Sequence, residues 1–159
     1  MYRNDQIDAQ MVVLNQDYSN TGLSFVLANI NRITSSSWFN IVGPDDDLQI
    51  DMKSQLRQGG AADLNLYSVG FKSGLLGYST YPFNYGLNSV NDGVVFLFST
   101  VPGGGYENFN GGRVSRHLPI HQRHMKCLNI LIDANTRSRT LGRVIPYFRW
   151  RKLGTTSAS

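Results

Sequence analysis

Apolar and polar positions along this chain follow two periods, one typical of helices and one typical of strands. Apolar residues recur at helical spacing between a polar start and a glycine stop, which predicts a helix over about residues 5–18 (Ile7, Met11 and Leu14). The next segment, LSFVLANINRI, alternates apolar and polar residues. This alternation predicts a half-buried strand over about residues 23–33.

A second series of elements follows. The segment PDDDLQIDMKSQLRQGG (residues 44–60) has acidic residues in its first turn, apolar residues at helical spacing and a glycine stop, and it predicts a second helix. Three strands are then predicted by ADLNLYSVGF (62–71), LLGYSTYP (75–82) and DGVVFLFSTV (92–101). The order helix, strand, helix, strand, strand, strand indicates an α/β (α+β) fold with about four strands and two helices.

Composition limits the class of protein. Apolar residues make up 41% of the 159 positions and charged residues 16%, as in a globular chain. No run of about 18 apolar residues appears, so we expect no membrane span. The start, MYRNDQIDAQ, lacks the basic flank and apolar stretch of a secretory signal. The single cysteine, Cys127, cannot form a disulfide within the chain.

The net charge of +4 conceals two unlike parts. Residues 1–113 contain 6 Lys and Arg against 10 Asp and Glu, whereas residues 114–159 contain 9 Lys and Arg against one Asp. The second part also contains all three histidines. A basic tail of this kind either binds nucleic acid or another acidic surface, or has a different origin from the rest of the chain.

Two further patterns have both a functional and a structural interpretation. The glycines of VPGGGYENFNGG (101–112) are better explained by turn chemistry than by a phosphate-binding loop, because no GxGxxG or GxxxxGK motif follows a strand. The aromatic residues between Tyr67 and Tyr85 either stack on bases or pack in the core and at its edge. We favour packing, because this segment is nearly free of Lys and Arg.

Several segments, in their order and spacing, resemble a known family: VLNQDYSNTGLSF, SSWFN, QLRQGGAADLNLYSVGF, GLLGYSTYP and DGVVFLFSTVPGG. Together they are similar to the fungal secreted metalloproteases of the pappalysin type, a branch of the metzincin zinc endopeptidases. The resemblance covers about residues 5–113. It implies the metzincin upper subdomain, which is a twisted mixed sheet backed by two helices, and an extracellular location.

The resemblance also assigns functional segments. The positions Leu75, Leu76, Gly77 and Tyr78 match the edge strand that pairs with an extended peptide or protein substrate in the family. In that family the GR pair after the glycine-rich loop leads into the active-site helix HExxHxxGxxH, which binds zinc and supplies the general base.

The chain departs from the family at this helix. His117 and His121 fall where the first two zinc ligands belong, but Leu118 replaces the base and Cys127 replaces the third histidine. His124 stands where the family has glycine, and proline at position 119 disfavours a helix. We interpret the HxxxH spacing as a decoy and expect no catalytic residue and no specifically bound zinc in this chain.

The codons that the tail permits suggest an explanation. Residues 114–115 can be encoded by GTAAGT or GTGAGT, the consensus start of an intron, and residues 132–133 can contain the acceptor TAG. Removing the bases between them shifts the reading frame. The codons of residues 136–146 then permit HEVGHWxGLYH, which keeps the HExxHxxGxxH spacing. We interpret the chain as the product of a retained intron, with the zinc motif out of frame.

This interpretation sets expectations for the structure. Residues 1–113 should form the metzincin-like, substrate-side subdomain, with a truncated start, because the family has a strand, a propeptide and a signal segment before the first helix. Residues 114–159 should be a non-native, disordered basic tail. Without the active-site helix, the apolar strand faces should be partly uncovered.

Three functions follow from these expectations. The first is an inactive fragment of an extracellular zinc metalloendopeptidase. The second is a non-enzymatic binding module whose basic tail contacts nucleic acid or anionic surfaces. The third is an inhibitor-like fragment that docks through its sheet edge. We favour the first and expect no nucleic-acid partner, because a translated intron yields a basic tail without selection for binding.

Overall fold

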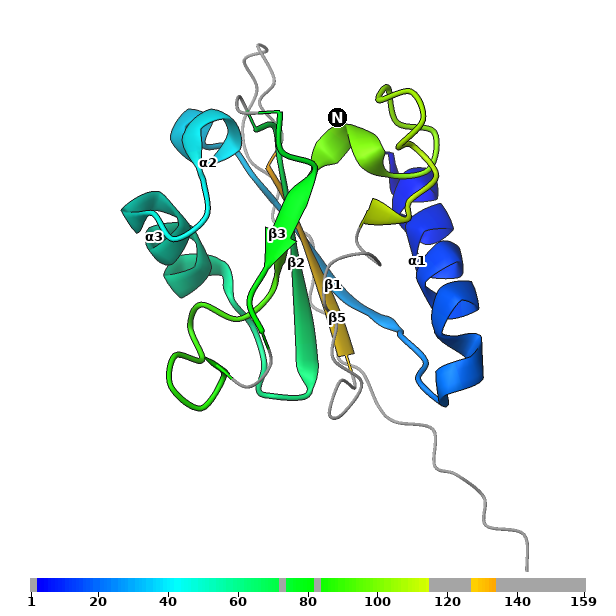
Figure 1. Cartoon of the computed structure of the whole chain (residues 1–159), viewed down its shortest axis with the longest axis horizontal. Coiled ribbons are helices and arrows are strands. Elements are labelled where there is room, and N and C mark those ends of the chain that lie inside the picture. The colour runs from blue at the N-terminus through cyan, green and yellow to red at the C-terminus, as the bar shows by residue number, and fades with distance from the viewer. Residues whose placement is uncertain (1–2, 72–73, 82–83, 115–126, 134–159) are drawn as a thin grey trace, which may run out of the picture.

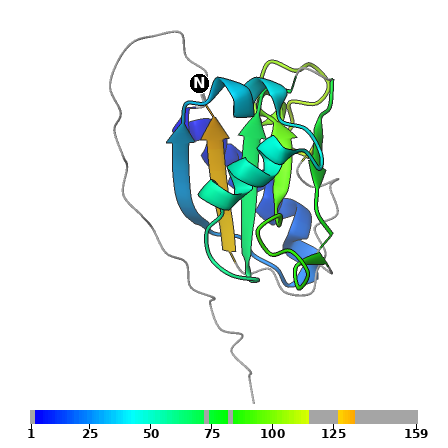
Figure 2. The same cartoon turned by 90° about the vertical axis from the view of Figure 1, so that its left-hand side faces the viewer.

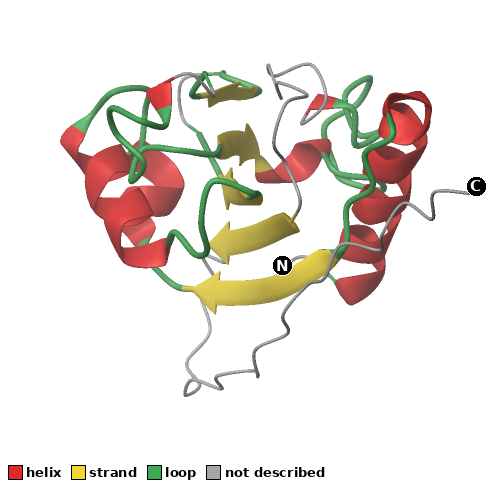
Figure 3. Cartoon of the chain, turned by 90° about the horizontal axis from the view of Figure 1, so that it is seen from below, coloured by secondary structure: helices red, strands yellow, loops and turns green. Residues whose placement is uncertain are grey.

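The computed structural model describes residues 3–71, 74–81, 84–114 and 127–133. In this part of the chain a mixed sheet lies between helix α1 (Asn4–Tyr18) on one face and helices α2 (Ser36–Ile41) and α3 (Asp47–Leu56) on the other (Figures 1 and 3). The five strands are β1 (Leu27–Ile33), β2 (Asp63–Val69), β3 (Gly77–Ser79), β4 (Val94–Leu97) and β5 (Cys127–Asp133). The expected α/β class is confirmed.

The strands lie in the order β1-β5-β2-β4-β3 (Figure 2). Strand β5 pairs in parallel with both β1 and β2, and β2 pairs in parallel with β4. Only β3, at the edge, is antiparallel to its neighbour β4. Four parallel strands with one antiparallel edge strand make the mixed sheet that was expected.

Side chains of β2 and β4 alternate between two apolar layers. One layer packs against α1 and contains Leu64, Leu66, Val94 and Phe96; the other packs against α2 and α3 and contains Tyr67, Val69, Val95 and Leu97. Every one of these eight side chains is buried. The expectation that the strand faces would be partly uncovered is therefore wrong, because helices cover both faces of these two strands.

One helix was not expected, and one strand begins later than its alternation of apolar and polar residues predicts. Helix α2 was not predicted, because its six residues are too few to show a helical period. Strand β1 begins at residue 27 rather than 23, since the Asn15 amide group pairs with the backbone of Phe25, accepting from its N–H at 2.6 Å and donating to its carbonyl at 2.8 Å. None of the described helices is long and apolar enough to cross a membrane.

Strand β5 is the largest departure. Residues 127–133 were expected to belong to a disordered tail, but they form a strand in the middle of the sheet, with register pairs that join Ile130 to both Ile30 and Leu66. In the described part of the chain these seven residues thus form a strand where a disordered tail was expected. The run LNILI has the apolar, β-branched character of a buried strand. Strands β1 and β2 run in parallel and do not pair with each other, so a strand between them can bond to both. The division of the chain after Arg113 otherwise stays a prediction, because residues 115–126 and 134–159 lie outside the described residues.

The start of α3 depends on one carboxylate. Asp46 Oδ1 accepts from the backbone N–H of Gln49 at 2.6 Å, and its Oδ2 accepts from that of Gly43 at 2.7 Å. We expect Asp46→Ala to lower the free energy of unfolding by about 1–2 kcal/mol, since both amides lose an acceptor. Urea unfolding would measure the loss. Asp47→Ala, which removes the neighbouring carboxylate, is the control and should cost less than half as much.

Candidate functional site at the β3 edge

Strand β3 presents one row of backbone groups that β4 does not use. Leu76 and Thr80 both bond to β4, since Leu97 N–H donates to Leu76 O at 2.9 Å and Thr80 N–H donates to Gly93 O at 3.3 Å. In an antiparallel pair, alternate residues face the partner strand. The N–H and C=O groups of Gly77 and Ser79 therefore point away from the sheet, as the pairing groups of an open edge do.

The side chains around this edge pack against the apolar layer between the sheet and helices α2 and α3. Leu75, Leu76 and Tyr78 are partly buried against it, and the Tyr78 ring lies 5.7 Å from that of Phe71. The Tyr78 hydroxyl donates to Gly43 O at 3.1 Å. Burial, helped by the nearby Asp46 and Asp45 carboxylates, raises the pKa of Tyr78, so its hydroxyl remains a donor. Of the expected edge residues, Gly77 and Tyr78 belong to β3, whereas Leu75 and Leu76 precede it and pack on the same part of the core.

The aromatic residues of this region are mostly structural, as expected. Tyr67 and Phe71 are buried, at 1% and 7% exposure. Tyr85 stacks with the Arg57 guanidinium at 5.3 Å. Tyr81 is half exposed, and position 83 lies outside the described residues.

The turn that leads into β4 is held on two sides. Gly93 has φ +125°, and a Cβ there would lie 2.7 Å from Asn65 O and 2.8 Å from Tyr67 Cε2. Its N–H donates to Thr80 Oγ1 at 3.2 Å. Thr80 directly follows β3, so the position of this turn sets where the edge strand ends.

A buried amine fixes the same turn from the other side. Lys53 of α3 is fully buried, and its Nζ donates to Asn91 O at 2.8 Å and to Asn91 Oδ1 at 3.2 Å. The Gln49 side-chain amide also donates to Asn91 Oδ1, at 2.7 Å. Burial lowers the pKa of Lys53 to about 8, although the carboxylates of Asp92 and Asp45 oppose the shift.

The surroundings of Lys53 are polar but incompletely paired. Among the described residues, the buried atoms Gln49 Oε1, Arg57 Nε and Tyr67 OH have no hydrogen-bond partner. Burial raises the pKa of Asp92, against the opposing charges of Arg57 and Lys53. Each unpaired buried polar atom lowers the free energy of unfolding by about 1–3 kcal/mol, so burying this cluster destabilises the fold locally.

The cluster formed by Lys53, Gln49 and Asn91 was not predicted from the sequence. Its signal was present, because Gln49 and Lys53 are spaced four residues apart and therefore share one face of α3, and Arg57 directly follows the helix. A long polar stripe beside the apolar stripe of the same helix is usually a solvated face. Only the partners, Asn91 in a distant loop and Tyr67 in β2, show that this face is turned inward.

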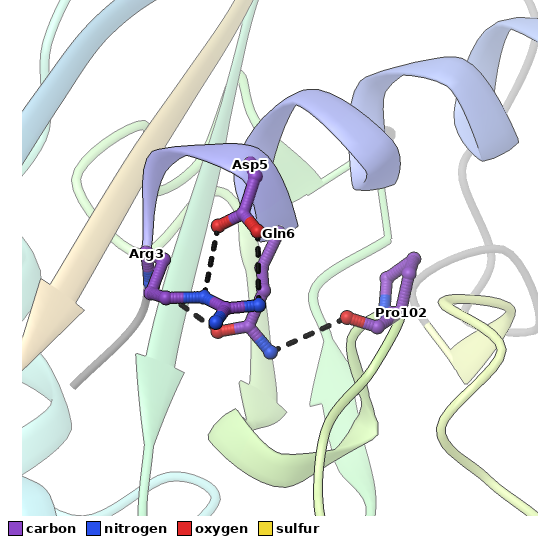
Figure 4. Close-up of polar contacts among 4 residues, drawn as sticks. All are labelled: Arg3, Asp5, Gln6 and Pro102. Carbon is purple, nitrogen blue, oxygen red and sulfur yellow. Dashed lines mark hydrogen bonds and ion pairs between the residues drawn. The ribbon is translucent and has the colours of Figure 1, made fainter.

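The glycine-rich loop rests on α1 through two glutamines. Gln6 Nε2 donates to Pro102 O at 3.3 Å (Figure 4), and Gln10 Nε2 donates to Gly112 O at 2.8 Å. At the exposed start of α1, Arg3 and Asp5 form an ion pair at 2.9 Å. Gly112 has a positive φ of 74°, in agreement with the turn interpretation. These contacts fix the place where the chain leaves the sheet toward Arg113.

The described residues do not fit a zinc site. Zinc in proteins is bound chiefly by His and Cys, and all three histidines (His117, His121 and His124) lie outside the described residues. Within the described ranges no group of three or more His, Cys, Asp or Glu could hold a metal ion. The prediction that the HxxxH spacing is a decoy remains untested.

Comparison with known proteins identifies relatives that are named extracellular metalloproteases. A protein of Arthroderma benhamiae named extracellular metalloprotease is 42% identical over 121 residues, which is 74% of this chain and 40% of that protein. An extracellular metalloprotease of Uncinocarpus reesii is 36% identical over 70% of this chain and 41% of its own length. Extracellular metalloprotease 1 of Coccidioides posadasii is 36% identical over 76% of this chain and 43% of its own length.

The chain thus spans about two fifths of the length of these relatives. It matches no protein-family model, and no solved structure matches it. Over about three quarters of its length, this chain is homologous to part of the fungal proteins named extracellular metalloproteases.

Proposed function

We propose that this chain is the substrate-side part of an extracellular zinc metalloendopeptidase of the pappalysin-type metzincin kind, and that it binds an extended peptide along β3 without cleaving it. The observation that carries the proposal is the outward row of backbone groups at Gly77 and Ser79. The names of the relatives support a protein or peptide as the ligand.

Binding would occur by strand addition. The peptide pairs its N–H and C=O groups with those of Gly77 and Ser79, while Tyr78, tied to Gly43, keeps the strand in place. Glycine at position 77 leaves the approach to the edge free of a side chain. Backbone pairing gives affinity for many sequences, as a protease that cuts diverse proteins requires.

The sequence supports the absence of cleavage in this proposal. The motif HExxHxxGxxH does not occur in the chain as written, so no glutamate stands beside a pair of histidines to take a proton from water. Purified chain incubated with zinc should show neither stoichiometric metal nor hydrolysis of casein. Chelator-sensitive cleavage would contradict this part of the proposal.

The origin of the tail has a separate test. We attribute residues 114–132 to a retained intron that places the zinc motif out of frame. Genomic and cDNA reads across codons 113–137 should show GTRAGT at codons 114–115, and CAC followed by GAA in the shifted frame that begins within codon 136. Other codons at either place would remove the basis of this attribution.

Strand addition is tested with peptides that differ only in N-methylation. An extended, Val- and Thr-rich heptapeptide should shift the amide resonances of Gly77 and Ser79 in ¹⁵N-labelled protein. Methyl groups on every second peptide nitrogen, in the phase that faces β3, should weaken binding at least about tenfold, since each blocks a ladder bond. Methyl groups in the other phase are the matched control and should have little effect.

A protein variant completes this test. Gly77→Pro removes a donor that faces away from β4, and proline is tolerated at such edge positions. We expect the variant to remain folded and to lose peptide binding. Equal binding of the two N-methylated peptides, or shifts confined to other elements, would refute strand addition at β3.

A further inference from the structure

A continuous set of contacts joins the interior of α3 to the end of the edge strand. Lys53 holds the carbonyl and side chain of Asn91, the chain then passes through Gly93, and the amide and carbonyl of Gly93 both bond to Thr80. Thr80 is the residue after β3. A displacement of the turn at residues 91–93 would therefore displace the end of β3.

The turn at residues 91–93, in the closed position that the structure shows, buries the Lys53 amine at a cost in free energy. Lys53 is fully buried, yet no carboxylate among the described residues lies within ion-pair distance of its Nζ. Its hydrogen-bond acceptors are the neutral oxygens of Asn91, and its nearest aromatic ring is that of Tyr67, with the centroid 5.7 Å away. A buried cation without a carboxylate partner favours any opening that returns it to water.

We propose that Lys53 and Asn91 form a proton-controlled latch: the neutral amine keeps the turn at residues 91–93 closed, the ammonium favours its opening, and the state of the turn sets the order of the β3 edge. The opening and closing of this latch do not depend on the peptide-binding function proposed for the β3 edge. Only its effect on peptide affinity rests on the proposed function of that edge.

The direction of the pH effect follows from linkage. Burial lowers the pKa of Lys53 to about 8 in the closed state, whereas a solvated lysine keeps its ordinary value of 10.5. The open state therefore binds the proton more tightly, and raising the pH favours the closed state. With these two values, the opening constant should fall about tenfold between pH 7 and pH 9.

The groups that face Lys53 modify this effect without reversing it. The carboxylates of Asp92, before β4, and Asp45, before α3, favour the ammonium, and their contributions are already included in the lowered pKa. Burial raises the pKa of Tyr67, so the hydroxyl of this β2 residue stays neutral over the same interval. The Arg57 charge opposes the effect of burial at both Asp92 and Tyr67.

The test uses the whole chain at pH 7 and pH 9. Hydrogen exchange of the Thr80 and Gly93 amides, corrected for the intrinsic pH dependence of exchange, should show the tenfold fall in opening. The Phe25 amide, on the α1 side of the sheet, is the internal control and should not change. In ¹³C-lysine-labelled protein, the Lys53 Cε resonance should titrate with a midpoint near 8, which requires no variant.

Two variants separate the effect of the charge at position 53 from the effect of side-chain packing. Lys53→Met is always neutral and Lys53→Arg is always charged, so opening should be independent of pH in both and smaller in the first. A Cε midpoint near 10.5, or an equal pH dependence in wild type and either variant, would overturn the latch. If no peptide binds at any pH while exchange behaves as expected, the proposed function of the edge fails and the latch stands.

Discussion

Replacing Ile130 with proline should strongly destabilise the domain. The residue is in the centre of β5, with β1 on one side and β2 on the other, so its amide lies within the ladder of a central strand. Proline removes that donor and places its ring against a neighbouring strand. We expect a loss of about 3 kcal/mol or more in the free energy of unfolding, measured by urea denaturation with circular dichroism.

Ile130→Val is the matched control, because it keeps the backbone donor and a β-branched residue, and it should cost much less than the proline. Small, equal effects of the two substitutions would mean that residues 127–133 do not complete the sheet. That outcome would agree with the disordered tail expected from the sequence. The pair of variants therefore decides between a tail that is part of the fold and one that only follows it.

Replacing Gly93 with alanine should cost about 4 kcal/mol. The added Cβ would lie 2.7 Å from Asn65 O, a backbone atom that cannot rotate away, and 2.8 Å from the buried Tyr67 ring. The φ of +125° adds backbone strain of about 1–3 kcal/mol for any residue with a side chain. Thermal and urea unfolding would measure the loss.

Gly86→Ala provides the comparison. A Cβ at Gly86 meets nothing within 4 Å, and its backbone is not left-handed, so the substitution should change stability by less than about 0.5 kcal/mol. If Gly93→Ala were equally mild, the turn at residues 91–93 would be free to move. Lys53 could not then control the β3 edge through it.

The sequence predicted those elements whose period is long enough to read. Helices α1 and α3 and strands β1, β2 and β4 coincide with the expected segments to within a few residues, because apolar residues repeat at 3.6 or 2 positions in the first four and run continuously in β4. The edge position of residues 75–78 came from family resemblance instead. No period distinguishes an edge strand of three residues from a loop.

The features that were missed depend on partners distant in sequence. Lys53 resembles a surface lysine until Asn91, 38 residues later, is placed beside it. The run LNILI lies in the segment interpreted as a translated intron, although its apolar, β-branched pattern is typical of a buried strand. A sheet accepts any segment of suitable length, polarity and β propensity, so an interpretation of where a segment came from does not settle whether it folds.

The central place of β5 has a consequence during synthesis. Its two neighbours, β1 and β2, belong to the first half of the chain, but they cannot be joined until residues 127–133 have left the ribosome. Until then, β1 and the sheet formed by β2, β4 and β3 both present unpaired edges that are open to other chains. Expression at high rates should therefore yield inclusion bodies, and chaperones that cover exposed strands during translation should increase the soluble fraction.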